Sequence, residues 1–76
     1  MLKSTYSHAA NAYMLYLAPI GPGEIALTHW VDRDDVPADI MLHFDKQRRL
    51  IGVEVQGAST ALPREVIDSA EQIDVD

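Results

Sequence analysis

The sequence predicts an α+β domain in which an antiparallel β-sheet of four to five strands carries one C-terminal α-helix packed on one face. Three observations lead to this fold. Two runs that alternate apolar and polar residues, 40–45 and 51–56, are joined by a short polar stretch, as in a β-hairpin. The run 12–17 has the same period of two. After Pro63 the apolar residues recur at helical spacing. The length of 76 residues predicts a single domain, 1–76.

The first two strands are expected at about 2–6 and at 12–17, with a turn of small and polar residues between them. In the second strand Met14 and Tyr16 share one face, opposite Tyr13, Leu15 and Leu17. The segment 19–23 contains two prolines and two glycines, which end the strand. A third strand is expected at 24–31, but its pattern does not determine which of its two faces points inward.

The hairpin is the clearest element of the sequence. Its turn, 46–49, holds no glycine, so we expect a loop of four or five residues built on a type I turn. Gly52 interrupts the second strand and marks a bulge or a close backbone approach. Six apolar residues are expected to be buried beneath the final helix. These are Ile40, Leu42, Phe44, Ile51, Val53 and Val55.

The helix is expected to follow Gly57, which ends the sheet. Pro63 suits the first turn of a helix, where its missing N–H costs nothing, and Glu65 lies near the positive end of the helix dipole. One face is apolar and is formed by Val66, Ile67, Ala70 and Ile73. About ten residues are too few for a helix that is stable alone, so this face must dock on the sheet or on a partner.

Composition excludes several classes of function. The net charge of −6 argues against nucleic-acid binding, and the absence of cysteine excludes disulfides and thiolate metal sites. The longest apolar run has about eight residues, whereas a membrane span needs about 20. With no signal peptide in view, the sequence predicts a soluble cytoplasmic protein without membrane association. A domain this small has a thin core, which favours a homodimer, and its acidic tail, 63–76, suits a basic protein partner.

The sequence also resembles a known family. The segments Tyr6–Leu17 and Ile40–Asp45, followed by Leu50–Val55 and Ala58-Ser59, resemble domain of unknown function 2283, a family of small prokaryotic proteins. The resemblance implies a sheet-plus-helix fold and no established activity. Because some members are encoded beside small toxin-like proteins, it also implies an antitoxin-like role.

Three positions depart from the family pattern. Ser7 and Asn11 stand where the family has aspartates in the first turn, and Arg48 replaces the usual glycine or asparagine of the hairpin. Ser7 and Asn11 still accept hydrogen bonds in a turn, but they lack the charge that a metal ion or a general base requires. The sequence therefore favours a structural role for both.

Candidate chemical sites are weak. His8, His29 and His43 lack the spacing of the histidines on a zinc-binding helix. The acidic loop 32–35 lacks the closing glutamate of a calcium-binding loop. Ser59 and Thr60 have no histidine at the fixed spacing that a catalytic nucleophile would need. Asp45 and Glu54 could face each other across the hairpin as a carboxylate pair, although charge balance with the basic turn explains them better. No catalytic residue, cofactor-binding residue or metal ligand is predicted.

An interaction surface is the strongest functional candidate. Met14, Tyr16 and Trp30 would expose aromatic and thioether surface if they lie on an open sheet face, and such patches often mark contact sites. The preferred hypothesis is therefore a protein–protein interaction or regulatory module, antitoxin-like and forming a homodimer, that is not an enzyme and uses no cofactor. The alternative is a small-ligand or metal-binding domain that uses the surface histidines.

Overall fold

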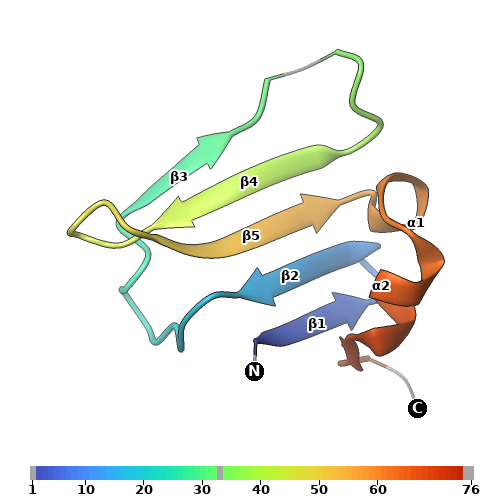
Figure 1. The fold of residues 1–76 in the computed structure, drawn as a ribbon, viewed down its shortest axis with the longest axis horizontal. Helices are drawn as coiled ribbons and strands as arrows, with labels where there is room; N and C mark the ends of the chain where they lie inside the picture. The colour runs from blue at the N-terminus through green and yellow to red at the C-terminus, as the bar shows by residue number, and fades with distance from the viewer. Residues whose placement is uncertain (1, 33, 75–76) are drawn as a thin grey trace.

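A mixed β-sheet forms the body of the molecule, and two short helices stand at one end of it (Figure 1). The computed structural model describes residues 2–32 and 34–74, and within them the sheet has six strands in the order β3-β4-β5-β2-β1-β6. The strands are β1 (Lys3–Ser7), β2 (Ala12–Tyr16), β3 (Leu27–Trp30), β4 (Asp39–Phe44), β5 (Leu50–Gln56) and β6 (Glu71–Gln72). The helices are α1 (Ala58–Ala61) and α2 (Arg64–Ser69).

The α+β class and the antiparallel pairing of β1 to β5 agree with the prediction. The described chain differs from it in a sixth strand, which makes the sheet mixed, and in two short helices where one was expected. Leu62 is extended in front of Pro63, which divides the helical segment into α1 and α2. Ala70 is also extended, so α2 ends after six residues. The chain then continues as β6, parallel to β1, and the Ile73 N–H donates to the Tyr6 carbonyl at 3.1 Å.

The strand register assigns each side chain to one of two faces. The helix-side face contains one row across four strands, formed by Tyr6, Tyr13, Val55 and Ile40. The next row on this face is Ser4, Leu15, Val53, Leu42 and His29. The opposite face contains two corresponding rows. They are Thr5, Met14, Glu54, Met41 and Trp30, then Lys3, Tyr16, Gly52, His43 and Thr28.

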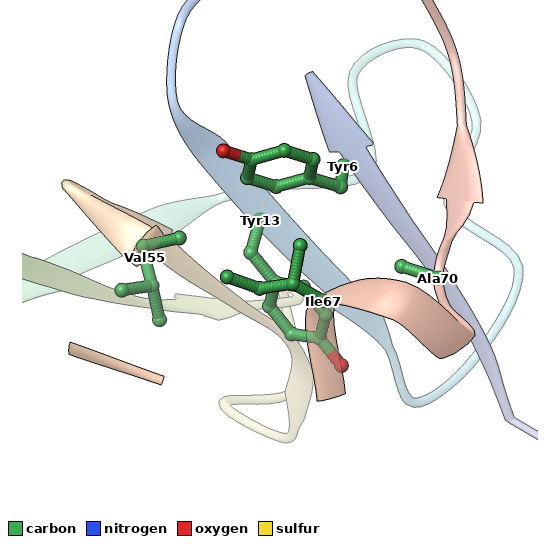
Figure 2. Close-up of a cluster of buried hydrophobic side chains, with 6 residues drawn as sticks. Tyr6, Tyr13, Val55, Ile67 and Ala70 are labelled. Atoms are coloured by element: carbon green, nitrogen blue, oxygen red, sulfur yellow. The ribbon is translucent and has the colours of Figure 1, made fainter. Parts of the chain in front are cut away.

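The main core lies where the helices meet the helix-side face. Figure 2 shows the side chains of Tyr6, Tyr13 and Val55 gathered around Ile67 of α2. Ala58 is fully buried and Ala70 is 6% exposed, so small residues let both helices approach the strands closely.

The helices cover only part of the six-residue core that the sequence predicts. Val55 is buried in the core under the helices, and the half-buried Ile40 packs against it. Ile51 is buried near the start of β5, outside this core, and the other members of the set are half-buried: Leu42, Phe44 and Val53. The physical reason is the shortness of α1 and α2, which stand at the end of the sheet where β5 ends and β2 begins (Figure 1). The rest of the helix-side face therefore has no helix over it in the described part of the chain.

Asn11 connects the first turn to α1. Its side-chain oxygen accepts hydrogen bonds from the Tyr6 hydroxyl at 2.8 Å and from the Ser59 N–H at 3.0 Å. Its carbonyl oxygen accepts from the N–H groups of Gly57 and Ala58 at 2.9 and 3.0 Å. Asn11 has φ of 50°, a left-handed conformation that asparagine tolerates better than most residues. One residue thus supplies acceptors to three successive N–H groups where α1 begins.

The hairpin turn is built around Asp45. The Arg48 N–H donates to the Asp45 carbonyl at 3.0 Å, and the carboxylate accepts from the N–H groups of Gln47 and Arg49. Arg48 adopts φ of 65°, the conformation for which glycine or asparagine is usual. The loop between β4 and β5 comprises residues 45–49, five residues as the prediction allows, with the left-handed position taken by arginine.

Of the two alternatives that the sequence offered for Gly52, the bulge is present, and the atoms closest to Gly52 belong to side chains. The β4–β5 register shifts between His43 and Phe44, which places a bulge beside Gly52. A Cβ atom at this position would lie 2.7 Å from the Met14 Cε and 3.2 Å from the Ile20 Cδ1. The loop after β2 thus packs Ile20 beside Gly52 on the opposite face, and a larger residue at position 52 would have to displace the ends of the Met14 and Ile20 side chains.

Candidate interaction surface

Exposed apolar side chains gather along β3, the edge strand of the sheet. Leu27 is 56% exposed and Trp30 is 54% exposed, and Ile25, which leads into the strand, is also exposed. Monomeric proteins leave single apolar residues exposed without consequence, but several together on one element are characteristic of contact sites. Among the six strands, β3 is the one that the sheet buries least.

The position of β3 explains this exposure. The strand pairs only with β4, and the described part of the chain places no other strand on its outer side (Figure 1). Leu27 and His29 project on the helix-side face beyond the reach of the helices, since they lie opposite Phe44 and Leu42. Trp30 projects on the opposite face, so apolar surface borders the same edge on both sides of the sheet.

The predicted surface of Met14, Tyr16 and Trp30 falls on one face, as the register shows. Met14 and Trp30 even share a row, but β4 and β5 lie between their strands, and the intervening Met41 is only 4% exposed. Met14 and Tyr16 are half-buried. The three residues therefore share a face, with Trp30 the most exposed member.

Tyr16 also borders a groove at the other side of the sheet. The groove has a volume of about 470 Å³ and is lined by Leu2, Lys3, Tyr16, Leu17 and the segment 18–20. The ammonium group of Lys3 lies 5.6 Å from the centre of the Tyr16 ring, within range of a cation–π interaction. This groove is remote from β3, because β4, β5 and β2 separate the two edges.

The three histidines are not brought together. His8 lies in the first turn, where its Nε2 is 2.7 Å from the Gln72 side-chain oxygen. His29 and His43 lie on neighbouring strands, but they project from opposite faces of the sheet. In the part of the chain that the structure describes, no three His, Cys, Asp or Glu side chains are grouped so that they could hold a metal ion.

His43 has a structural role that the sequence did not reveal. It is 7% exposed, and its Nδ1 lies 2.8 Å from the Thr28 hydroxyl while its Nε2 lies 3.0 Å from a Glu54 carboxylate oxygen. Since a carboxylate only accepts, Nε2 donates to Glu54, and in a neutral ring Nδ1 then accepts from the Thr28 hydroxyl. Both ring nitrogens of a buried imidazole are therefore satisfied, as burial requires.

A hydroxyl, an imidazole and a carboxylate in this order also form the catalytic triad of hydrolases. The surroundings of these three groups, however, are unsuited to binding a substrate. Neither Thr28 nor His43 lines any of the described surface depressions. His43 and Glu54 lie in the middle of strands that are paired on both sides, where backbone N–H groups are used by the sheet and cannot stabilise an oxyanion. The alternating pattern did carry a signal, because it places residues 28, 43 and 54 on one face.

Asp45 and Glu54 do not form the carboxylate pair that the sequence left as the weaker alternative to charge balance. The Asp45 carboxylate is hydrogen-bonded within the hairpin turn. The N–H groups of Arg49 and Gln47 and the Arg49 guanidinium lower its pKa. Glu54 instead contacts His43 and accepts from the Gln56 amide at 3.1 Å. The acidic loop 32–35 includes position 33, which lies outside the described residues.

The acidic C-terminal segment is partly tied to the first turn. The Asp74 carboxylate accepts from the N–H groups of His8 and Ala9 and from the Ser7 hydroxyl, each within 2.9 Å. Hydrogen bonds to the charged form lower the pKa of Asp74 to about 2.

Comparisons with protein-family models, with curated proteins and with solved structures gave no match to this chain. The described helices include none that is long and apolar enough to cross a bilayer.

Proposed function

We propose that this protein is a protein–protein interaction module that self-associates through the apolar surface along β3. The observation that carries the proposal is the exposure of Leu27 and Trp30, on the two faces of one edge strand. Burying such side chains against another chain is favourable by about 25 cal/mol for each Å² of apolar surface removed from water. The sites of contact are enriched in tryptophan for the same reason.

The thin core gives self-association a second benefit. The helices cover one end of the helix-side face, so Leu42 and Val53 stay half-buried in the single chain. A domain of 76 residues has little stability to spare, roughly 3–5 kcal/mol, and association adds to it by mass action. A regulatory role, antitoxin-like as the family resemblance implies, is one form that such a module takes, and the net charge of −6 favours a basic partner for it.

Sedimentation velocity tests the proposal over a range of about 1 to 300 µM, which brackets a weak dimer. We expect the wild-type protein to be dimeric at the upper end and to dissociate on dilution. The variant Leu27→Ser should weaken the dimer by about tenfold, which corresponds to about 1.4 kcal/mol.

Leu2→Ser is the matched control, because Leu2 is 57% exposed and Leu27 is 56% exposed. Leu2 precedes β1, remote from β3, so its replacement should leave the dimer unchanged. A protein that stays monomeric at the highest concentration would contradict the proposal, as would equal effects of the two substitutions.

A further inference from the structure

The outer edge of β3 has an alternating pattern of backbone groups. The Val31 N–H donates to the Ile40 carbonyl at 2.9 Å, which fixes the direction of the pattern. Successive residues of a strand direct their N–H and C=O groups to opposite sides, so those of His29 also point toward β4. The N–H and C=O groups of Thr28 and Trp30 therefore point away from the sheet, along an edge that no described strand occupies.

Charge favours this edge as the place where two copies meet. The segment 25–31 contains no Asp, Glu, Lys or Arg, in a chain whose net charge is −6. Two copies repel each other overall, so the contact that costs least lies where acidic side chains are absent. Proteins usually protect exposed edge strands with charged residues or proline, and β3 has neither.

The other edge of the sheet is a poor alternative. β6 has only two residues and begins with Glu71, and the Asp74 carboxylate follows shortly after it. Two copies that paired there would bring like charges together. Among the described strands, β3 is thus the edge suited to pairing with itself.

We propose that β3 pairs antiparallel with β3 of a second copy, across a twofold axis that passes beside His29. This inference rests on the proposed self-association and specifies its geometry. The outward-pointing N–H and C=O groups of Thr28 and Trp30 set the register. Both residues form hydrogen bonds when Thr28 of each copy lies opposite Trp30 of the other copy. This gives two reciprocal pairs of hydrogen bonds. Twofold symmetry makes the contact closed and self-complementary.

The register places defined side chains together. His29 faces His29 of the second copy in a pair without mutual backbone hydrogen bonds, with Cα atoms about 4.5 Å apart. Trp30 lies beside Thr28 of the second copy on the opposite face, where aromatic and β-branched residues pair favourably. The row that ends at Leu42 and His29 then continues across the contact into the second sheet.

Single cysteine variants test the register, because the chain contains no cysteine. His29→Cys places two cysteines at a Cα separation of about 4.5 Å, inside the disulfide range of about 4.4–6.8 Å. Leu27→Cys is the matched control on the same strand and face. In the proposed register Leu27 lies opposite Val31 of the second copy, so its two copies are offset by four residues, about 13 Å.

We expect His29→Cys to form a disulfide-linked dimer in a glutathione redox buffer at least about tenfold more readily than Leu27→Cys, because pairing gives its thiols a high effective concentration. Both positions are exposed, so the fold should survive, and circular dichroism checks this. Amide hydrogen exchange supplies an independent readout. The N–H groups of Thr28 and Trp30 should be protected only at high concentration, whereas that of His29 stays protected on dilution.

The outcomes separate this inference from the proposed function. A dimer in sedimentation that shows neither the His29→Cys disulfide nor the alternating exchange pattern would overturn edge pairing and leave self-association standing. Equal disulfide yields at positions 27 and 29 would also overturn the register. A protein that is monomeric throughout would refute both proposals.

Discussion

Replacing Asn11 should destabilise the fold more than its place in a turn suggests. The Asn11→Ala variant loses the acceptor for the Tyr6 hydroxyl and for the Ser59 N–H. Each of these hydrogen bonds contributes about 1 kcal/mol net, so their loss costs about 2 kcal/mol. Alanine at φ of 50° adds about 1 kcal/mol, because its Cβ is crowded in the left-handed region.

The expected total of about 3 kcal/mol is a large part of the roughly 3–5 kcal/mol that a domain of this size has. Urea denaturation followed by far-ultraviolet circular dichroism measures it. With a slope of about 1 kcal/mol per molar urea, the midpoint should fall by about 3 M. A substantial fraction of Asn11→Ala would then be unfolded without urea.

Two further variants separate the causes. Asn11→Gly removes the acceptor but accepts the positive φ, so it should lose about 2 kcal/mol, less than alanine. Asn11→Asp keeps an acceptor, and its negative charge faces the N–H groups at the start of α1, so it should be as stable as the wild type or more so. If Asn11→Gly were as stable as the wild type, the hydrogen bonds to the Asn11 side-chain oxygen would contribute no stability, which would contradict the prediction.

Three other substitutions test separate parts of the fold. Ile67→Ala should cost about 3 kcal/mol, because it leaves a cavity where α2 meets the sheet; a loss below about 1 kcal/mol in urea denaturation would contradict that packing. Gly57→Ala should cost about 1 kcal/mol, since φ is 84° there although a Cβ has room, and an unchanged midpoint would show that the strain is absent. The lowered pKa of Asp74 means that its stabilisation is fully present above about pH 3.8 and is lost as the pH falls toward 2, so Asp74→Asn should flatten the melting temperature between pH 4 and 2. Equal pH profiles for Asp74→Asn and the wild type would contradict the contacts with His8 and Ala9.

The strands could be predicted because one physical rule produces both the pattern and the pairing. Successive side chains of an extended strand point to opposite faces, so the hairpin and the neighbouring strand can be recognised from the sequence. Gly52 was also interpretable, since glycine inside a strand has few causes. The third strand was placed too early, because Glu24 belongs to a turn in which its N–H donates to the Gly21 carbonyl at 3.2 Å.

The helix could not be predicted fully because its end depends on contacts distant in sequence. The apolar spacing that includes Ile73 continues past Ser69, so the sequence favoured about ten helical residues. The chain instead becomes extended at Ala70, where bonding of Ile73 to Tyr6 and of Asp74 to the first turn replaces further helical turns. Tertiary context often overrides local propensity in this way.

The shortness of the helix also determines the candidate surface. A helix of ten residues across the sheet would have buried the row that contains Leu42 and Val53, and the interaction hypothesis would then depend on the opposite face with Met14 and Tyr16. Because α1 and α2 stand at one end, the exposed apolar surface lies instead toward β3. The strand whose inward face the sequence left undetermined is exposed on both faces, because it has one neighbouring strand and no helix over it in the described part of the chain.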